Sequence, residues 1–138
     1  MQTYLNEMKY GNCDITQWNG NGRNSYPQLN GFWLESSLLI SPMEQVKVLY
    51  QAFETDMFHE KTKNIVKELM KVEEEDIPLY GKTGTGYNEA GDCVDGWFVG
   101  WLQAKDPVYF AIRLQDTKAE DSTGNKAKEI AISIIKNR

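Results

Sequence analysis

The spacing of apolar residues predicts two amphipathic helices in the first half of the chain. The first begins at Ser41-Pro42-Met43-Glu44, where Ser41 can cap the helix, Pro42 suits its first turn and Glu44 completes a capping box. The second is expected over residues 58–72. The residues expected to face inward are Val46, Leu49, Tyr50 and Phe53 in the first helix and Ile65, Val66, Leu69 and Met70 in the second.

Farther along, apolar residues follow a period of two, which predicts three strands over residues 77–86, 95–104 and 107–115. The loops between these segments are short and polar, so an antiparallel meander is expected. The faces of the second strand would carry Trp97, Val99 and Trp101 on one side and Phe98 and Leu102 on the other. Those of the third would carry Val108, Phe110, Ile112 and Leu114 on one side and Tyr109, Ala111 and Arg113 on the other.

Helical signals return at both ends of the chain. A final helix is predicted to begin at Ser122-Thr123-Gly124, and the first nine residues look like a helix that lacks an N-cap. Residues 10–31 are rich in glycine and asparagine, which is typical of loops. The predicted class is therefore α+β, and the uncapped start indicates a chain that begins part-way through a domain. The apolar stripe of the final helix is expected to be Ala127, Ile130, Ala131, Ile134 and Ile135.

Composition narrows the classes of function. Of the 138 residues 41% are hydrophobic and 25% charged, as in a soluble globular domain, and the net charge of −5 argues against a nucleic-acid or anionic-membrane surface. Cys13 and Cys93 are expected to be free, and with one histidine and no Cys-x-x-Cys no metal site is expected. No apolar run approaches the roughly 18 residues of a membrane span, and the N-terminus has no signal-peptide core.

The chemistry is concentrated in the polar, glycine-spaced run Leu79–Gly86, which carries Lys82, Thr83 and Thr85. A lysine, two hydroxyls and small residues along a strand suit recognition of an anion, because a ligand can approach the backbone closely. A phosphate-binding P-loop is excluded, since that motif needs a glycine at position 76, which is Asp76, and needs to open a helix.

Several segments, taken in order, carry a resemblance over essentially the whole chain. These segments are Tyr10-Gly11-Asn12, Phe32-Trp33-Leu34-Glu35, Ser41-Pro42-x-Glu44-Gln45-Val46, Lys82-Thr83-Gly84-Thr85-Gly86 and Gly96-Trp97-Phe98-Val99-Gly100. In this order they are similar to the C-terminal half of class D serine β-lactamases (oxacillinases), and equally to the sensor domains of Gram-positive β-lactam receptors, both of the penicillin-binding superfamily. The resemblance implies one partial domain over residues 1–138: helices, a three-stranded antiparallel meander and a final helix, without the family's N-terminal strands and nucleophile helix.

The resemblance also implies roles for individual residues. Lys82 would supply positive charge and a proton-relay contact, and the backbone N–H of Thr85 would donate to the developing oxyanion. Trp33 would shield the carboxylated lysine that the family's enzymes use, although no cofactor is expected in this chain itself. Substrate binding would fall to Thr83, Gly84, Leu34 and Lys126, with Lys128 as the alternative to Lys126, and cleft support to Tyr10, Gly11 and Asn12.

Two family motifs are not matched in this chain. The nucleophile motif Ser-x-x-Lys would precede Tyr10, whereas the one such string here, Ser133-Ile134-Ile135-Lys136, lies in the predicted final helix and is read as a coincidence. The second motif, Ser-x-Val or Ser-x-Asn, is also missing. The arginine that commonly holds the substrate carboxylate is replaced by a segment with Lys126 and Lys128, and lysine lacks the bidentate fork of arginine.

Three functions therefore stay open. The parent protein is a β-lactamase that is acylated by β-lactams and hydrolyses them, or a sensor that stays acylated, or the chain is a non-catalytic piece that associates with itself. In each case this chain alone is expected to be inactive. The implied partners are a β-lactam or peptidoglycan-like small molecule and a homodimer or strand-swapped oligomer. The parent is expected to be secreted, periplasmic or membrane-anchored facing outside.

Overall fold

A computed structural model describes residues 1–20, 31–32, 36–73, 77–88, 90–115 and 122–137. The chain forms two compact units, Met1–Val48 and Leu49–Arg138, and the boundary lies within the second helix. The described elements are α1 (Gln2–Met8), α2 (Pro42–Glu54), α3 (Glu60–Met70), β1 (Leu79–Tyr87), β2 (Cys93–Leu102), β3 (Val108–Gln115) and α4 (Gly124–Lys136). None of these described helices is long and apolar enough to cross a bilayer.

The first unit contains α1 and the start of α2. Helix α1 has no side-chain cap at its start, as its sequence predicts, and its C-cap residue Lys9 has the left-handed conformation. The capping box of α2 is confirmed: the Ser41 N–H donates to Glu44 Oε2 over 2.8 Å, and the Glu44 N–H donates to Ser41 Oγ over 3.3 Å. These reciprocal bonds satisfy backbone donors that a helix start otherwise leaves unpaired.

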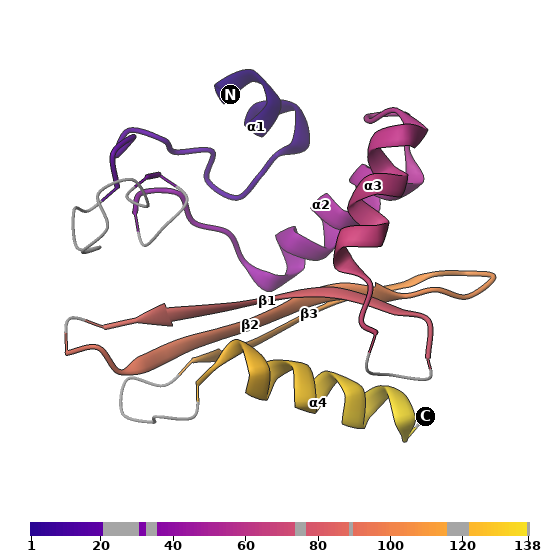
Figure 1. Cartoon of the computed structure of the whole chain (residues 1–138). Coiled ribbons are helices and arrows are strands. Elements are labelled where there is room, and N and C mark those ends of the chain that lie inside the picture. Colours follow the sequence, from indigo (N-terminus) through magenta and orange to yellow (C-terminus); the bar gives the residue numbers. More distant parts are fainter. Residues whose placement is uncertain (21–30, 33–35, 74–76, 89, 116–121, 138) are drawn as a thin grey trace. The chain divides into compact units, whose positions relative to one another are not determined.

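The second unit is built on the predicted meander. Its three strands lie in the order β1-β2-β3, and both pairs are antiparallel, so the predicted topology is confirmed (Figure 1). Thr83 lies opposite Phe98 and Lys82 opposite Val99. Because side chains alternate between faces, Thr83 shares a face with Phe98, and Lys82 shares the other face with Val99.

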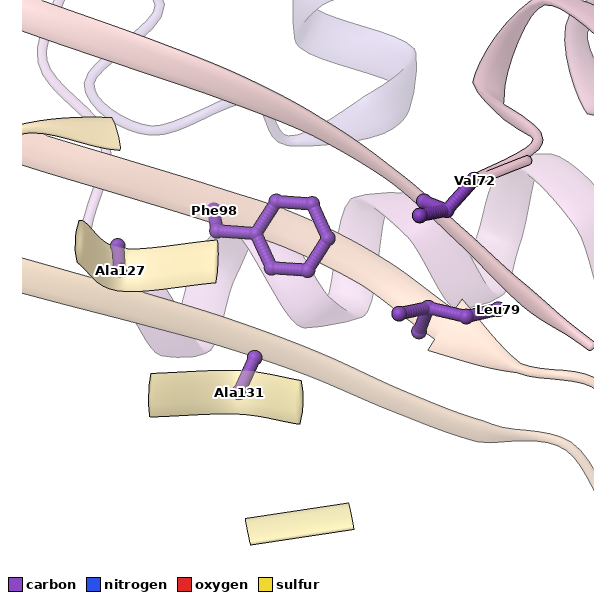
Figure 2. Packing of buried hydrophobic residues seen from close by; sticks show 5 residues of the cluster. All are labelled: Val72, Leu79, Phe98, Ala127 and Ala131. Atoms are coloured by element: carbon purple, nitrogen blue, oxygen red, sulfur yellow. The ribbon is translucent and has the colours of Figure 1, made fainter. Parts of the chain in front are cut away.

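Helix α4 covers the face of the sheet that carries Phe98 (Figure 1). The buried cluster there joins β1, β2 and α4 with Val72, which lies two residues beyond the end of α3, as Figure 2 shows. Two alanines on the helix side allow close packing, and the larger Phe98 and Leu79 fill the space from the sheet. The cluster comprises Val72, Leu79, Phe98, Ala127 and Ala131, with Ile77, Phe110, Ile112, Leu114, Ile132 and Ile135 packed partly against it.

The opposite face of the sheet carries an aromatic cluster around Trp101, whose side chain is fully buried. The ring of Tyr80 is parallel to the Trp101 ring at 4.9 Å, and Phe53 of α2 lies 4.4 Å from it. Tyr109 lies 6.1 Å away on β3 and donates a hydrogen bond of 2.5 Å to Glu54. The last turn of α2 therefore packs on this sheet face within the second unit.

Four of the predicted core positions are wrong. Ile65 and Leu69 of α3 are 52% and 79% exposed, and Ile134 of α4 is also largely exposed. In α3 the buried side chain is Lys63, and its ammonium group donates a 2.7 Å hydrogen bond to Glu60 one turn earlier. In α4 the residues that pack against the sheet are Ala127, Ala131 and Ile135, and Ile132 lies beside them. Tyr50 of α2 is also more exposed than predicted, although its ring contacts Tyr109 edge-on at 6.0 Å.

Candidate functional site

The candidate site lies along the open edge of β1, where backbone groups are not used by the β1–β2 ladder. Pro78 C=O accepts from Gln103 N–H on the β2 side, whereas Leu79 C=O accepts from Val72 N–H on the other side. Successive residues of an antiparallel strand point their N–H and C=O groups to alternate sides. The backbone groups of Gly81, Thr83 and Thr85 therefore point to the open edge, away from β2.

Lys82 brings its charge to this same edge. Its side chain is exposed, and its Nζ donates a 2.7 Å hydrogen bond to Thr83 C=O, which is one of the edge carbonyls. Thr85 is two residues farther along, which is roughly 7 Å at the rise of a β-strand. An ammonium group and an edge N–H at this separation can contact the two ends of one small anionic ligand.

The start of α4 fixes the side chain of Thr85. The backbone N–H of Gly124 donates to Thr85 Oγ1 over 3.0 Å, so the threonine hydroxyl keeps its own proton to give to a ligand. The helix approaches this closely because position 124 has no side chain: a Cβ there would lie 2.6 Å from the carbonyl oxygen of Gly84. Thr123 caps the helix by accepting from the Lys126 N–H over 3.1 Å.

The two lysines at the start of α4 lie in different surroundings. Lys126 is exposed, and its Nζ lies 3.3 Å from Glu129 Oε2. Lys128 lines a hollow of about 190 Å³ beside β1, together with Lys71, Lys82 and Thr83. Sequence reasoning put Lys126 first, but Lys128 lies one helical turn after Gly124, and that spacing was the signal for its nearness to β1.

Tyr10, Gly11 and Asn12 lie in the first unit, where Asn12 joins two chain segments. Its Oδ1 accepts from the Leu39 N–H over 3.0 Å, its backbone N–H donates to Leu39 C=O over 2.9 Å, and its Nδ2 donates to Ser37 C=O over 2.8 Å. Gly11 has a positive φ of 54°, and a side chain there would overlap the Leu39 carbonyl. Burial raises the pKa of Tyr10 above its ordinary value.

The remaining sequence-predicted residues are apart from this edge or are not described. Trp33 and Leu34 lie outside the described residues. Ser133 and Lys136 are exposed near the end of α4, and the Ser133 carbonyl is occupied by the Asn137 N–H and side-chain amide. Cys13 and Cys93 are free thiols. Among the described residues no three side chains of the His, Cys, Asp or Glu types gather as a metal site would need.

Comparison with known proteins identifies the family of the chain. Residues 1–136 match the family model of the penicillin-binding protein transpeptidase domain. The chain is 38% identical over 138 residues to "Probable beta-lactamase YbxI" of Bacillus subtilis, covering 99% of this chain and 45% of that protein. It is 36% identical to "Regulatory protein BlaR1" of Bacillus licheniformis, covering 98% of this chain and 21% of that protein. The chain thus spans about half the length of the first of these relatives, and less of the second.

Solved structures give the same result for the fold. A class D β-lactamase, FUS-1 of Fusobacterium nucleatum, superposes with a TM-score of 0.73 at 35% identity, over 99% of this chain and 52% of that one. The C-terminal domain of the Bacillus licheniformis BlaR penicillin receptor gives a TM-score of 0.74 at 33% identity, over 99% of this chain and 51% of that one. Both the predicted fold class and the predicted resemblance are confirmed. The chain belongs to the penicillin-binding protein transpeptidase domain family, with class D β-lactamases and β-lactam receptors among its relatives.

Proposed function

We propose that this chain forms the binding wall of a β-lactam site and that the parent protein is a class D β-lactamase-like enzyme. The observation that supports the proposal best is the convergence of three donors at the edge of β1: the Lys82 ammonium, the Thr85 hydroxyl and the Thr85 N–H. The relatives named as β-lactamases and as a penicillin receptor agree with a β-lactam as the ligand.

In this proposal each donor has one task. The Lys82 ammonium and the hydroxyls of Thr83 and Thr85 bind the carboxylate region of the β-lactam, and Gly84 leaves the other face of β1 open to the rest of the molecule. The backbone N–H of Thr85 donates to the carbonyl oxygen of the β-lactam ring as that oxygen becomes negative. A donor fixed in a strand needs no reorganisation during the reaction, which makes it effective in stabilising the transition state.

The other predicted residues have supporting roles. Asn12 and Gly11 hold the segment around Leu39 in place, which suits support of a cleft. By the resemblance to the family, Trp33 and Leu34 would line the pocket around the nucleophile of the parent. The carboxylate clamp is a lysine at the start of α4, and the position of Lys128 in the hollow beside Lys82 favours it over Lys126. A parent that meets β-lactams outside the cell would be exported.

The parent's acylation by a β-lactam needs a serine of a Ser-x-x-Lys motif, which we place in the parent outside residues 1–138. The 138-residue chain should therefore give no covalent adduct with benzylpenicillin by intact-mass spectrometry, and no hydrolysis of a chromogenic cephalosporin. An adduct on this chain would contradict the proposal, because Ser133 on α4 would then be the natural suspect. The control is Ser133→Ala, which leaves the result unchanged in our account.

An alternative function is that of a sensor, favoured by the 33–36% identity to the BlaR proteins. The parent protein distinguishes the two functions when mixed with a chromogenic cephalosporin. Sustained turnover identifies an enzyme, whereas a single stoichiometric burst followed by a stable acyl adduct identifies a sensor. Absence of both in the parent would overturn the proposed function and leave the self-associating, non-catalytic chain.

A further inference from the structure

The sheet face that carries Lys82 also carries, away from the Trp101 cluster, an aromatic side chain that the site described above does not use. Trp97 lies on β2 directly opposite Gly84 and on the same face as Lys82. Opposite it on β3 is Arg113, whose guanidinium lies 5.0 Å from the centre of the indole ring. The tryptophan is only partly buried, so part of its ring is open to a ligand.

Arg113 is itself held in place by Asp95. Its Nε donates to Asp95 Oδ1 and its Nη2 to Asp95 Oδ2, each over 2.8 Å. This fork matches the two carboxylate oxygens and restricts the guanidinium plane more than a single bond would. Asp95 neutralises the arginine, and the arginine in turn restricts the indole through a cation–π contact. Residues on two strands thus orient one aromatic ring.

Strand β1 has no side chains on the surface next to the indole ring of Trp97. On the face shared with Trp97, the residues that follow Lys82 are Gly84 and Gly86, which pair with Trp97 and Asp95. A Cβ added at Gly84 would come no nearer than 3.8 Å to a described atom outside its neighbours, and that atom is the Cβ of Trp97. A group bound at the Thr85 edge can therefore extend across β1, one strand width of roughly 5 Å, to the indole.

We propose that Trp97, oriented by Arg113 and Asp95, is the platform on which the aromatic acyl side chain of a β-lactam stacks. This inference rests on the proposed function, since it requires the β-lactam nucleus at the β1 edge. Trp97 would contact the substrate, whereas Arg113 and Asp95 act as positioning residues through the ring. The site then prefers β-lactams with an aromatic acyl group over those with a small one.

The test compares two penicillins that differ only in the phenyl group: benzylpenicillin and the same nucleus acylated with acetate. Both are titrated into the 138-residue chain and followed by the indole N–H resonances in nitrogen-edited NMR spectra, with Trp97→Phe to assign the Trp97 signal. The wild-type chain should bind benzylpenicillin about three- to tenfold more tightly, the range that an aromatic pair contributes. The Trp97 resonance should move with benzylpenicillin more than with the acetyl compound.

Arg113→Gln separates positioning from general stability. It should bring the affinity ratio of the two penicillins close to one while leaving the affinity for the acetyl compound unchanged. Trp97→Phe should keep part of the preference and Trp97→Leu should lose it, and far-ultraviolet circular dichroism checks that each variant is folded. A ratio near one in the wild type, or a ratio unaltered in Trp97→Leu and Arg113→Gln, overturns the inference alone. Failure of both penicillins to bind the wild type overturns the proposed function as well.

Discussion

At the scale of the residue, the glycines of β1 serve two different purposes. A Cβ at Gly81 would lie 2.5 Å from the Phe98 ring and 3.0 Å from Val99 C=O, so the packed core leaves no space for a side chain at this position. Gly84 is open, with the nearest described atom at 3.8 Å. One glycine is therefore required for packing, and the other leaves space at the candidate site.

This contrast predicts opposite results for two alanine substitutions in the same strand. Gly81→Ala should lower the free energy of unfolding by about 1–3 kcal/mol, because the added methyl overpacks the core. Gly84→Ala, the matched control, should be neutral or stabilising by about 0.5 kcal/mol, because alanine restricts the unfolded chain. Urea denaturation of both variants measures the difference. Equal losses in the two variants would show that β1 does not pack against Phe98 as described.

Tyr109 gives a prediction for pH. Burial, then the hydrogen bond to Glu54, raises the pKa of Tyr109 above its ordinary value of about 10. The folded state therefore binds this proton more tightly than the unfolded chain. The stabilisation is fully present below about pH 10 and is lost as the pH rises toward the folded pKa.

Thermal melts between about pH 9 and 12 should therefore show a steeper fall for the wild type than for Tyr109→Phe. Tyr4→Phe is the control, since Tyr4 is an exposed residue of α1 and should keep the wild-type slope. A Tyr109→Phe curve parallel to the wild type would count against the burial of the Tyr109 hydroxyl and its contact with Glu54.

At the scale of the element, α4 links the core to the candidate site. Its start donates to Thr85, and its middle packs on Phe98 and Leu79. The two neighbouring isoleucines near its end test this orientation: Ile135 packs against the core cluster, and Ile134 is largely exposed.

Ile135→Ala should lower the free energy of unfolding by about 1–3 kcal/mol. This loss is smaller than that for a fully buried isoleucine, because Ile135 is only partly buried. Ile134→Ala should change it by no more than about 0.5 kcal/mol. Chemical denaturation of the pair decides the orientation of the helix. A larger loss in Ile134→Ala would mean that α4 is rotated on the sheet.

The same helix shows how far sequence patterns reach. Alternation predicted the strands, and the capping box predicted the start of α2, because both signals are local. The apolar stripes of α3 and α4 were each predicted only in part, since periodicity defines an apolar face but not which of its residues the rest of the molecule will cover. At the site, Lys82–Gly86 is contiguous and could be predicted, whereas the contact from Gly124 to Thr85 joins residues 39 apart and has no local signal.

At the scale of the whole molecule, the described sheet has two edges, β1 and β3. From the register, the odd-numbered residues of β3 point their backbone groups away from β2. An exposed edge of this kind can pair with another chain, and this agrees with the prediction of a dimer or strand-swapped oligomer.

Ala111→Pro tests edge pairing, because it removes an outward N–H without removing a bond to β2. The wild type should show concentration-dependent mass above 15.8 kDa in sedimentation velocity, and Ala111→Pro should shift toward the monomer. The spectrum of the variant by circular dichroism serves as the folding control. A wild type that is monomeric at all concentrations would contradict pairing through β3.

The central claim, that the β1 edge is the wall of a β-lactam site, is tested most directly by the affinity of this chain for benzylpenicillin. Calorimetric titration should give saturable binding that falls about tenfold or more in Lys82→Gln, the loss expected for a charge-assisted hydrogen bond. The control Lys105→Gln, an exposed lysine of the β2–β3 loop, should bind like the wild type. Binding that is absent, or equal in Lys82→Gln and Lys105→Gln, would contradict the claim.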